Sequence, residues 1–503
     1  MAETIWQLLD TCDNAAIALS APERPPLDYA GLKEQVASTA ATLTARGVAQ
    51  DDTVGIVLPN GPEMASAFLS VACSATAAPL NPSYTEEEFA FYLTDLDAKA
   101  VMVMDGVDTP ARDVARAKGM NLLEIRVADD APAGRFLIDG QAAVANVRRQ
   151  SSPNDTALVL HTSGTTSRPK IVPLSQRNVS ASAQHIRDTL ALTADDRCLN
   201  IMPLFHIHGL IAVIMASTGA GASVYCTPGF NAMKVFGWMT NAEPTWYSAV
   251  PTMHQAILAR AARNREIIER LGLRFIRSSS ASLPPQVMTE LEETFGCPVI
   301  EAYGMTEAAH QMASNRLPPA GRKAGTVGLA AGPEVAIMNE DGALLEQGAK
   351  GEVVIRGPNV TAGYRNNEKA NAEAFTSGWF RTGDQGVIDG DGYLTITGRL
   401  KEIINRGGEK VSPREVDDVL MDHPAVAQVV TFALPHDKLG EEVAAAIVLK
   451  DGETAEPKDI ASFAGERLAA FKVPRKVVIL DEIPKGATGK LQRIGLAEKL
   501  GLA

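Results

Sequence analysis

The first third of the chain alternates short apolar runs with segments of helical periodicity, and no other feature restricts the fold as strongly. The run TVGIVLPN begins at Thr53, small and apolar residues at helical spacing extend from Pro62 to Ala78, and KAVMVMD begins at Lys99. This alternation indicates a largely parallel sheet covered by helices. A further apolar run, TALVLHTSG from Thr156, predicts a buried strand that ends in a glycine-containing loop. We therefore expect an α/β fold.

The second half of the chain has a different texture, which predicts a second domain. At 503 residues the chain is too long for one hydrophobic core. From about Gly351, short β-rich segments broken by Gly, Pro and Asn predict hairpins. After Leu400 come two β-like runs, a helical segment and another strand-like run. We predict a large domain over residues 1–399 and a small α+β domain over residues 400–503.

Charge and composition exclude several classes of partner. A net charge of -13 argues against nucleic acid, because a phosphate-binding surface needs clustered Lys and Arg. The N-terminus carries acids where a signal peptide has cations, and no apolar run approaches the roughly 20 residues that span a bilayer. Five scattered cysteines without a CxxC spacing predict reduced thiols. We expect no membrane partner and a cytoplasmic location, while the sequence predicts no oligomeric state.

The stretch HTSGTTSRPK, residues 161–170, has the composition of an anion-binding loop. Unpaired backbone N–H groups in a Gly/Ser/Thr turn form a concave site for anionic oxygens, and the hydroxyl groups add donors. It is not a Walker A loop, because Lys170 follows Pro169 instead of Gly and precedes Ile171 instead of Ser or Thr. Since hydroxyl-rich surface loops are common, the choice between a phosphate site and an ordinary loop depends on the other motifs.

Two further motifs supply groups that suit a nucleotide. EAYGMTE offers an aromatic ring at Tyr303 for stacking, a hydroxyl at Thr306 for phosphate, and a carboxylate at Glu307 that suits Mg²⁺. WFRTGD ends in Asp384, whose carboxylate accepts hydrogen bonds and suits a pair of ribose hydroxyls. Each residue taken alone also fits an ordinary exposed or capping position.

GRLKEIINRGGEKVSP places Arg399 beside the predicted domain junction, and PKGATGKLQR places Lys490 after two glycines. Together with the earlier motifs, their order and spacing resemble the adenylate-forming superfamily of acyl-CoA synthetases, 4-coumarate–CoA ligases and luciferases over essentially the whole chain. This resemblance implies a large multi-sheet N-terminal domain and a small, mobile α+β C-terminal domain. It also implies that a carboxylate attacks ATP to give an acyl adenylate, which a thiol then attacks, with ATP, Mg²⁺ and coenzyme A taking part.

The resemblance further assigns roles to individual residues. The phosphate loop comprises Thr162, Ser163, Gly164, Thr165, Thr166 and Lys170, and the adenine walls comprise Ser280 to Ser282, Glu301, Ala302 and Tyr303. Thr306 and Glu307 correspond to phosphate and metal contacts, Asp384 to the ribose acid, Arg399 to its cationic neighbour, Lys490 to the adenylation lysine, and Lys401 to the domain hinge. Gly408 corresponds to the glycine that lets the pantetheine arm pass, where a side chain would fill the tunnel.

One position departs from the family pattern. Family members usually carry Gly after the loop lysine, whereas this chain has Ile171. A β-branched residue disfavours a positive φ, so we expect a slightly different backbone at this position.

The segments that correspond to the acyl pocket, PLFHIHGL, SSSASLP and MTEAAHQM, contain His206, His208, Ser280 and His310. A single histidine in such a place is usually structural, and we expect this of His206. Two further imidazoles, His208 and His310, suit a second carboxylate that does not react. A long acyl chain would instead require an apolar groove.

The motifs together resemble one branch closely, the oxalyl-CoA synthetases of plants, fungi and bacteria. This resemblance implies oxalate as the acid, with Ser280, His208 and His310 around its distal carboxylate. Three alternatives stay open on the sequence: a ligase for malonate or another short- or medium-chain acid, an amino-acid-activating enzyme, and a nucleotide sensor without catalysis. The sensor is disfavoured by the presence of Lys490, Glu307 and Asp384.

Overall fold

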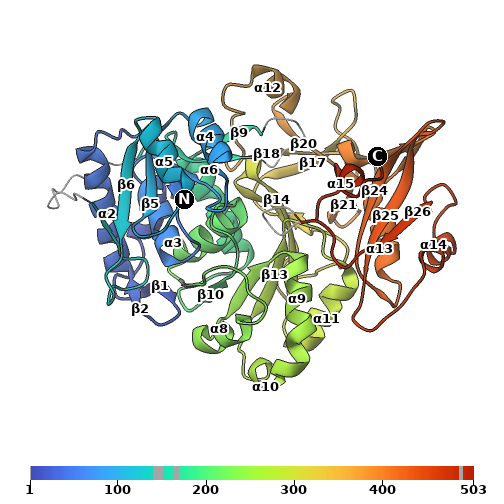
Figure 1. Cartoon of the computed structure of the whole chain (residues 1–503), viewed down its shortest axis with the longest axis horizontal. Coiled ribbons are helices and arrows are strands. Elements are labelled where there is room, and N and C mark those ends of the chain that lie inside the picture. Colours follow the sequence, from blue (N-terminus) through green and yellow to red (C-terminus); the bar gives the residue numbers. More distant parts are fainter. Residues whose placement is uncertain (1, 140–150, 163–168, 486–490) are drawn as a thin grey trace.

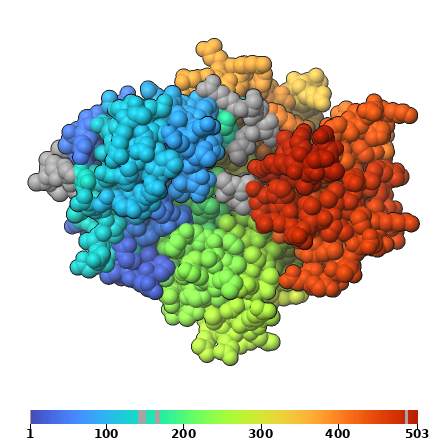
Figure 2. Space-filling model, in the orientation of Figure 1, coloured from blue at the N-terminus to red at the C-terminus, as the bar shows by residue number. Residues whose placement is uncertain are grey.

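The computed structural model describes residues 2–139, 151–162, 169–485 and 491–503. A large N-terminal lobe contains three sheets, and a small C-terminal lobe, orange to red in Figure 1, lies against one side of it. In Figure 2 the red lobe lies beside the green and yellow part of the large lobe, which contains the strands around residues 275–305.

The first sheet has seven strands in the order β7-β6-β5-β3-β4-β8-β9. Its strands are β3 (Thr53–Val57), β4 (Thr76–Pro79), β5 (Ala98–Met104), β6 (Asn121–Arg126), β7 (Leu137–Ile138), β8 (Thr156–His161) and β9 (Ile171–Ser175). Only the pairings of the edge strands β7 and β9 are antiparallel, so the prediction of a largely parallel sheet is confirmed. Helices α3 (Pro62–Ala72), α4 (Glu86–Asp95) and α5 (Pro110–Ala117) contact its strands, and α2 (Tyr29–Ala45) packs against α3 and against β1 and β2 of the second sheet.

The helical prediction for residues 62–78 was too long. Helix α3 ends at Ala72, and Thr76–Pro79 forms strand β4. Every residue of α3 and of β4 is buried. When all faces are apolar, periodicity does not separate a buried helix from a buried strand, which explains the error. Helix α3 contacts strands of both large sheets, and this accounts for its complete burial.

The second sheet has nine strands in the order β16-β15-β14-β13-β12-β10-β11-β1-β2. Its strands are β1 (Ile17–Ala21), β2 (Arg24–Asp28), β10 (Arg197–Asn200), β11 (Ser223–Cys226), β12 (Trp246–Ala249), β13 (Phe275–Ser279), β14 (Val299–Met305), β15 (His310–Ser314) and β16 (Leu329–Ala330). The strands from β14 to β1 in this order are parallel to their neighbours. The pairs β1–β2, β14–β15 and β15–β16 are antiparallel. Helices α6 (Gln176–Thr189), α8 (Val235–Ala242), α9 (Pro251–Ala261) and α11 (Pro285–Phe295) and the π-helix η1 (His208–Met215) accompany it.

The third sheet is antiparallel and contains the hairpins predicted after residue 351. Its strands are β17 (Glu334–Met338), β18 (Lys350–Arg356), β19 (Phe375–Thr376), β20 (Trp379–Ile388) and β21 (Leu394–Arg399). The chain leaves this sheet at Arg399 and passes through one short helical turn, η4 (Leu400–Glu402), into the C-terminal lobe.

The C-terminal lobe has a five-stranded sheet of its own, made of β22 (Ile404–Arg406), β23 (Glu409–Val411), β24 (Val426–His436), β25 (Gly440–Leu449) and β26 (Lys476–Ile479). Val443, Ala445 and Ile447 of β25 enter one hydrophobic cluster, while Ala444 and Ala446 enter another. Because successive side chains of a strand point to opposite faces, both faces of β25 are buried, and its sequence is a continuous apolar run. Helices α13 (Pro413–Met421), α14 (Pro457–Gly465) and α15 (Leu496–Lys499) complete the lobe.

All five cysteines are free thiols, as the sequence predicts. A search of the described residues for an apolar helix long enough to span a membrane found none.

Candidate active site

Asp384 lies at the centre of a polar group drawn from three strands. Its Oδ1 accepts a 2.8 Å hydrogen bond from Arg399 Nε, and its Oδ2 accepts one from the hydroxyl of Tyr303. Asp384 and Arg399 face each other in the register of β20 and β21, and Tyr303 comes from β14 of the second sheet. Asp384 is 5% exposed, and its charge is the main cause that raises the pKa of Arg399. Of the residues predicted for the nucleotide site, these three are in direct contact.

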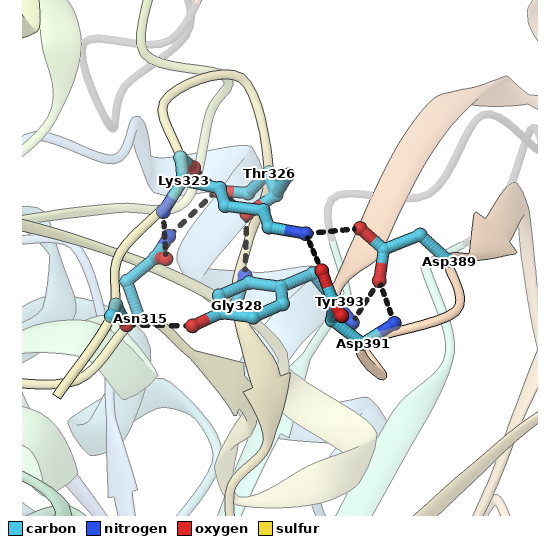
Figure 3. A network of polar contacts seen from close by, with 8 residues as sticks. Asn315, Lys323, Thr326, Gly328, Asp389, Asp391 and Tyr393 are labelled. Carbon is cyan, nitrogen blue, oxygen red and sulfur yellow. Dashed lines mark hydrogen bonds and ion pairs between the residues drawn. The ribbon is translucent and has the colours of Figure 1, made fainter.

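The turn that joins β20 to β21 is held against the segment after β15 by the hydrogen bonds in Figure 3. Lys323 Nζ donates to Asp389 Oδ2 at 2.8 Å and to Asp391 Oδ2 at 2.6 Å, and it lies 4.6 Å from the centre of the Tyr393 ring. Lys323 N donates to Asn315 Oδ1, which belongs to the segment after β15. The network therefore holds the hairpin that carries the Asp384–Arg399 pair against β14 and β15.

Glu307 is a buried carboxylate with a tyrosine partner and a cation nearby. Its Oε1 accepts a 2.9 Å hydrogen bond from the Tyr364 hydroxyl, and Lys170 Nζ lies 4.3 Å from the centre of the Tyr364 ring. Burial raises the pKa of Glu307 above its ordinary value. Thr306, its neighbour in the short helix η3 (Thr306–Ala308), is half-buried. The carboxylate of Glu307, the hydroxyl of Tyr364 and the ammonium group of Lys170 therefore lie close together.

The family resemblance implies Mg²⁺, with Glu307 as its contact on the protein. Within the described ranges, no group of three or more His, Cys, Asp or Glu side chains could hold a metal ion. Mg²⁺ in nucleotide sites is usually bound by one or two carboxylates together with phosphate oxygens and water. A single buried carboxylate such as Glu307, whose charge burial disfavours, therefore fits a nucleotide-borne Mg²⁺ but not an ion held by protein alone.

Glu301 is 1% exposed and lies where the two lobes meet. Its Oε1 accepts a 3.0 Å hydrogen bond from Leu283 N, and within the described residues its Oε2 has no hydrogen-bond partner. Burial raises the pKa of Glu301 to about 7, against the opposing charge of Arg414 from the C-terminal lobe. Ser282 and Arg414 line the same inter-lobe cavity of ≈ 180 Å³, beside helices α11 and α13. The charge of Arg414 in the small lobe therefore acts on Glu301 across the junction between the lobes.

The ring of His208 lies between the hydroxyl groups of two serines, one on strand β12 and one directly after strand β13. Its Nδ1 lies 3.0 Å from Ser280 Oγ, and its Nε2 lies 2.6 Å from Ser248 Oγ. His208 begins the π-helix η1 and is 2% exposed. π-Helical turns are rare and are found frequently at functional sites. Ser248 belongs to β12, and Ser280 is half-buried directly after β13.

His310 packs against His208 with ring centres 4.9 Å apart and an interplanar angle of 73°. It is 1% exposed. Three non-glycine residues here adopt the left-handed backbone region: Ser280 at φ 74°, Ala309 at φ 46° and His310 at φ 100°. Such strained positions persist only where the surroundings impose them, and they cluster at functional sites. The predicted acyl-pocket residues are thus brought together at strained backbone positions.

Arg277 was not predicted, although it lies at the same place. It is 0% exposed on β13, where it faces Ser248 in the strand register. Its Nη1 lies 3.4 Å from both Ser248 Oγ and His208 Nε2, and its Nη2 donates to Gln311 Oε1 at 3.4 Å. Burial lowers the pKa of Arg277 to about 9, so it is protonated at neutral pH. The one sequence signal was a charged residue between Ile276 and three serines, in the segment RFIRSSS that contains β13.

Part of the predicted phosphate loop lies outside the described residues, namely Ser163, Gly164, Thr165 and Thr166, and so does Lys490. At the base of the loop, Thr162 N donates to Lys170 O at 2.9 Å, and Lys170 N donates to Thr162 Oγ1 at 3.3 Å. Ile171 then starts β9, is 5% exposed and pairs with His161. It has no positive φ, so a β-branched residue is accommodated in the strand.

Three other predicted residues lie on the sheet or near the lobe junction. Ala302 is buried in β14, and its carbonyl accepts a 2.8 Å hydrogen bond from Ser279 Oγ. Lys401 is exposed within η4, at the point where the chain enters the small lobe. Gly408 lies in the turn between β22 and β23 with φ 97°, and a Cβ atom there would contact nothing within 4 Å. In this arrangement the backbone conformation, not lack of space, requires glycine.

Family models and relatives of known name match most of this chain. The family model of the AMP-binding enzymes matches residues 7–365, and that of the AMP-binding enzyme C-terminal domain matches residues 415–490. The oxalate–CoA ligase of Arabidopsis thaliana is 47% identical over 95% of this chain and 94% of its own length. The oxalate–CoA ligase of Saccharomyces cerevisiae is 43% identical over 90% of this chain and 87% of its own length. The crystal structure of ATP-bound MatB from Rhodopseudomonas palustris superposes with a TM-score of 0.89, at 29% identity over 99% of both chains.

Proposed function

This chain belongs to the AMP-binding enzyme family, and we propose that it is an acid–thiol ligase that makes oxalyl-CoA from oxalate and coenzyme A. One oxalate carboxylate attacks the α-phosphorus of ATP, which gives oxalyl adenylate and releases pyrophosphate. The thiol of coenzyme A then attacks the acyl carbon of the adenylate, and AMP leaves. Activation is needed because a free carboxylate is a poor acyl donor, whereas AMP is a good leaving group.

The cluster of the buried His208 and His310 with the half-buried Ser280 is the observation that supports oxalate as the acid. It offers hydroxyl and imidazole groups, packed together, in a chain 47% identical over 95% of its length to an oxalate–CoA ligase. Charged acceptors such as carboxylates form stronger hydrogen bonds with such donors than neutral groups do. A fatty acyl chain would offer the Ser280 hydroxyl no acceptor, and a buried donor without an acceptor costs about 1–3 kcal/mol.

The nucleotide is proposed to lie between the lobes. Asp384 would accept the ribose hydroxyls, with Arg399 holding its carboxylate in place. Tyr303, Ala302 and Glu301 would border the adenine. Since the hydroxyl of Tyr303 donates to Asp384, the ring orientation and the ribose acceptor are fixed together.

The phosphates are proposed to lie against the loop of residues 162–170 and against Thr306. Lys170 supplies a positive charge to the phosphate oxygens. Glu307 would hold Mg²⁺ together with phosphate oxygens, and Mg²⁺ when bound neutralises charge on those oxygens. Without a cation, burial raises the pKa of Glu307, so the site gains stability when a cation binds there.

Lys490 is proposed as the adenylation lysine, which bridges the attacking carboxylate and the α-phosphate as charge develops. Preorganised cations contribute most where charge appears only in the transition state. The same face cannot hold Lys490 and an incoming thiol, so the small lobe, residues 400–503, would turn about Lys401 between the two steps. This turn would bring Gly408 toward the thiol path and gate the reaction.

The alternative acid, malonate or another short- or medium-chain carboxylate, is not favoured. Two relatives from different kingdoms, at 47% and 43% identity, are both named oxalate–CoA ligases. The acidic balance and the five free cysteines support a cytoplasmic location.

An acid panel tests the proposal directly. Purified protein is incubated with ATP, Mg²⁺ and coenzyme A together with oxalate, malonate, glycolate, a medium-chain fatty acid or an aromatic acid, and AMP and thioester are both quantified. We expect the highest kcat/KM with oxalate. A higher value with any other acid in the panel would show that the substrate assignment is wrong.

A further inference from the structure

Arg277 is a buried cation without a carboxylate partner among the residues that the structure describes. Its side chain is 0% exposed, and the polar atoms around its guanidinium belong to Ser248, His208 and Gln311. An unpaired charge inside a protein costs several kcal/mol. A residue of this kind inside a strand of the central sheet therefore requires an explanation beyond packing.

The guanidinium decides which way the neighbouring hydrogen bonds run. Arginine has only donors, so Arg277 Nη1 must donate, and Ser248 Oγ, at 3.4 Å, accepts. The hydroxyl hydrogen of Ser248 is then free to be donated to His208 Nε2 at 2.6 Å. Arg277 Nη1 also lies 3.4 Å from the same nitrogen. Since donors surround Nε2, this nitrogen is the acceptor of the ring.

The opposite polarity is disfavoured by one contact. If Nε2 carried the proton, it would donate to Ser248, but its N–H would face the N–H of Arg277 across 3.4 Å. Two donors at this distance repel each other, and burial provides no water to separate them. Charging the whole ring would add a second positive charge at the same place.

The proton of His208 therefore lies on Nδ1, and this has a consequence for Ser280. Nδ1–H donates to Ser280 Oγ at 3.0 Å, which occupies one lone pair of the hydroxyl. The hydroxyl hydrogen of Ser280 is then directed away from His208. Ser280 has a left-handed backbone, at φ 74°, and its Oγ is held beside His208 Nδ1.

We propose that Arg277 is a positioning residue: through Ser248 and His208 it turns the Ser280 hydroxyl into a hydrogen-bond donor for the second carboxylate of the acid. This proposal rests on the proposed function, since it takes the pocket beside Ser280 to be the acyl pocket. A carboxylate accepts such a hydrogen bond, whereas the alkyl end of a monocarboxylate cannot. A site built around a buried donor rejects a ligand without the matching acceptor, because the donor is left unpaired.

The first experiment measures the tautomer of His208 without any substrate. Histidine is labelled with ¹⁵N throughout, and the signal of His208 among the eight histidines is identified by its loss in a His208→Gln variant. We expect Nδ1 protonated and Nε2 unprotonated in the unaltered protein. In Ser248→Ala, which leaves Arg277 in place but removes the bridging hydroxyl, we expect the two tautomers to mix. A His208 protonated on Nε2 in the unaltered protein would overturn the proposal.

The second experiment measures selectivity with oxalate and with glycolate, in which a hydroxymethyl group replaces the second carboxylate. For Ser248→Ala we expect the oxalate KM to rise about tenfold, the loss of one hydrogen bond. For Arg277→Met we expect a rise of about a hundredfold, as for the loss of a hydrogen bond to a charged group. The KM for ATP should stay unchanged in both, and Arg277→Lys, which also only donates, should restore part of the loss.

Arg274→Met is the matched control. Arg274 lies just before β13 and pairs with Asp196 on the outside of the fold, at 2.6 Å and with 38% of its side chain exposed. Its loss should change stability but not the oxalate KM or the His208 tautomer. If Arg277→Met does not fold, Ser248→Ala alone decides, since an unchanged tautomer and an unchanged oxalate KM in that variant would overturn the proposal. If His208 carries its proton on Nδ1 but neither the unaltered protein nor any variant uses oxalate, the hydrogen-bond directions from Arg277 to Ser280 are supported. The assignment of oxalate as the acid is then wrong.

Discussion

The acyl pocket and the nucleotide site are built in different ways. Arg277, His208 and His310 are 0%, 2% and 1% exposed and stand on the second sheet or packed against it. By contrast, the nucleotide site combines Tyr303 of the second sheet with Asp384 and Arg399 of the third, and 44% of the Arg399 side chain is exposed. The proposed acyl pocket therefore draws on the second sheet and on η1 beside it, whereas the proposed nucleotide site combines strands of two sheets.

This difference has a physical reason. Discrimination between small acids depends on a few donors held in fixed positions, which burial and packing provide. In the proposed reaction, ATP would enter and leave as AMP while the small lobe changes position, so its site would have to open. Substitutions in the two sites test this contrast. Their expected effects decrease from Lys490 to Lys323, and a factor of ten in a rate or in KM corresponds to about 1.4 kcal/mol.

The largest effect is expected at Lys490. The Lys490→Ala variant should lose at least about a thousandfold in the rate of adenylate formation, because the cation that meets the developing charge is gone. Thioester formation from supplied oxalyl adenylate should continue. Pyrophosphate release measures the first step and thioester the second, and equal losses in both steps would contradict the assignment.

The next effect is on stability and depends on pH. Burial raises the pKa of Glu301 from its ordinary value of 4.5 to about 7, so the folded protein binds this proton more tightly than the unfolded chain does. The contribution of Glu301 to stability therefore falls as the pH rises through this window. In Glu301→Gln the group no longer titrates, so the variant should gain about 3 kcal/mol relative to the unaltered protein between about pH 4 and pH 8.

Thermal unfolding of both proteins across this pH range measures the effect. The difference in Tm should grow as the pH rises. A difference that stays constant with pH, or that shrinks as pH rises, would show that Glu301 keeps an ordinary pKa in the folded protein.

His310→Ala tests the acyl pocket alone. It removes one side chain from the cluster, and we expect the KM for oxalate to rise about a hundredfold, the cost of an unpaired buried charge on the substrate. The KM for ATP should not change, because His310 packs against His208 in the proposed acyl pocket. Steady-state kinetics with each substrate varied in turn separate the two outcomes, and an unchanged oxalate KM would remove His310 from the substrate site.

Asp384→Asn is the reciprocal test in the nucleotide site. The amide keeps the size of the side chain and one acceptor oxygen, but it loses the charge that Arg399 and the ribose hydroxyls meet. We expect the KM for ATP to rise about tenfold while the KM for oxalate stays constant, since part of the interaction with the half-exposed Arg399 is screened. A parallel rise in both KM values would mean that the two sites are not independent.

The smallest effect is expected in the network of Figure 3. Lys323→Met removes a solvent-accessible cation from Asp389 and Asp391, and such surface ion pairs contribute little to stability. The loss should appear as a slightly lower Tm that high salt abolishes. A large rise in the KM for ATP would show instead that this network holds the Asp384 hairpin in its active position.

Much of this molecule could be predicted from its sequence for local reasons. Apolar runs such as Thr53–Val57 and Ala98–Met104 are strands, because a stretch that is buried on both faces must be apolar throughout. The boundary between α3 and β4 could not be predicted, because helix and strand are equally apolar there. The motifs indicated Tyr303 and Asp384, and the resemblance implied Arg399 as the cationic neighbour of Asp384, but neither indicated that the Tyr303 hydroxyl donates to the same carboxylate.

The sequence by itself determined which chemical groups the chain carries and the order of its strands and helices, because these depend on residue type and local periodicity. The tertiary structure decided which groups meet. Ser248 and Arg277 are neighbours only because β12 and β13 pair in one particular register, and His208 joins them only because η1 packs beside that sheet. The direction of a hydrogen bond depends on the partner across space, and no spacing along the chain encodes that partner.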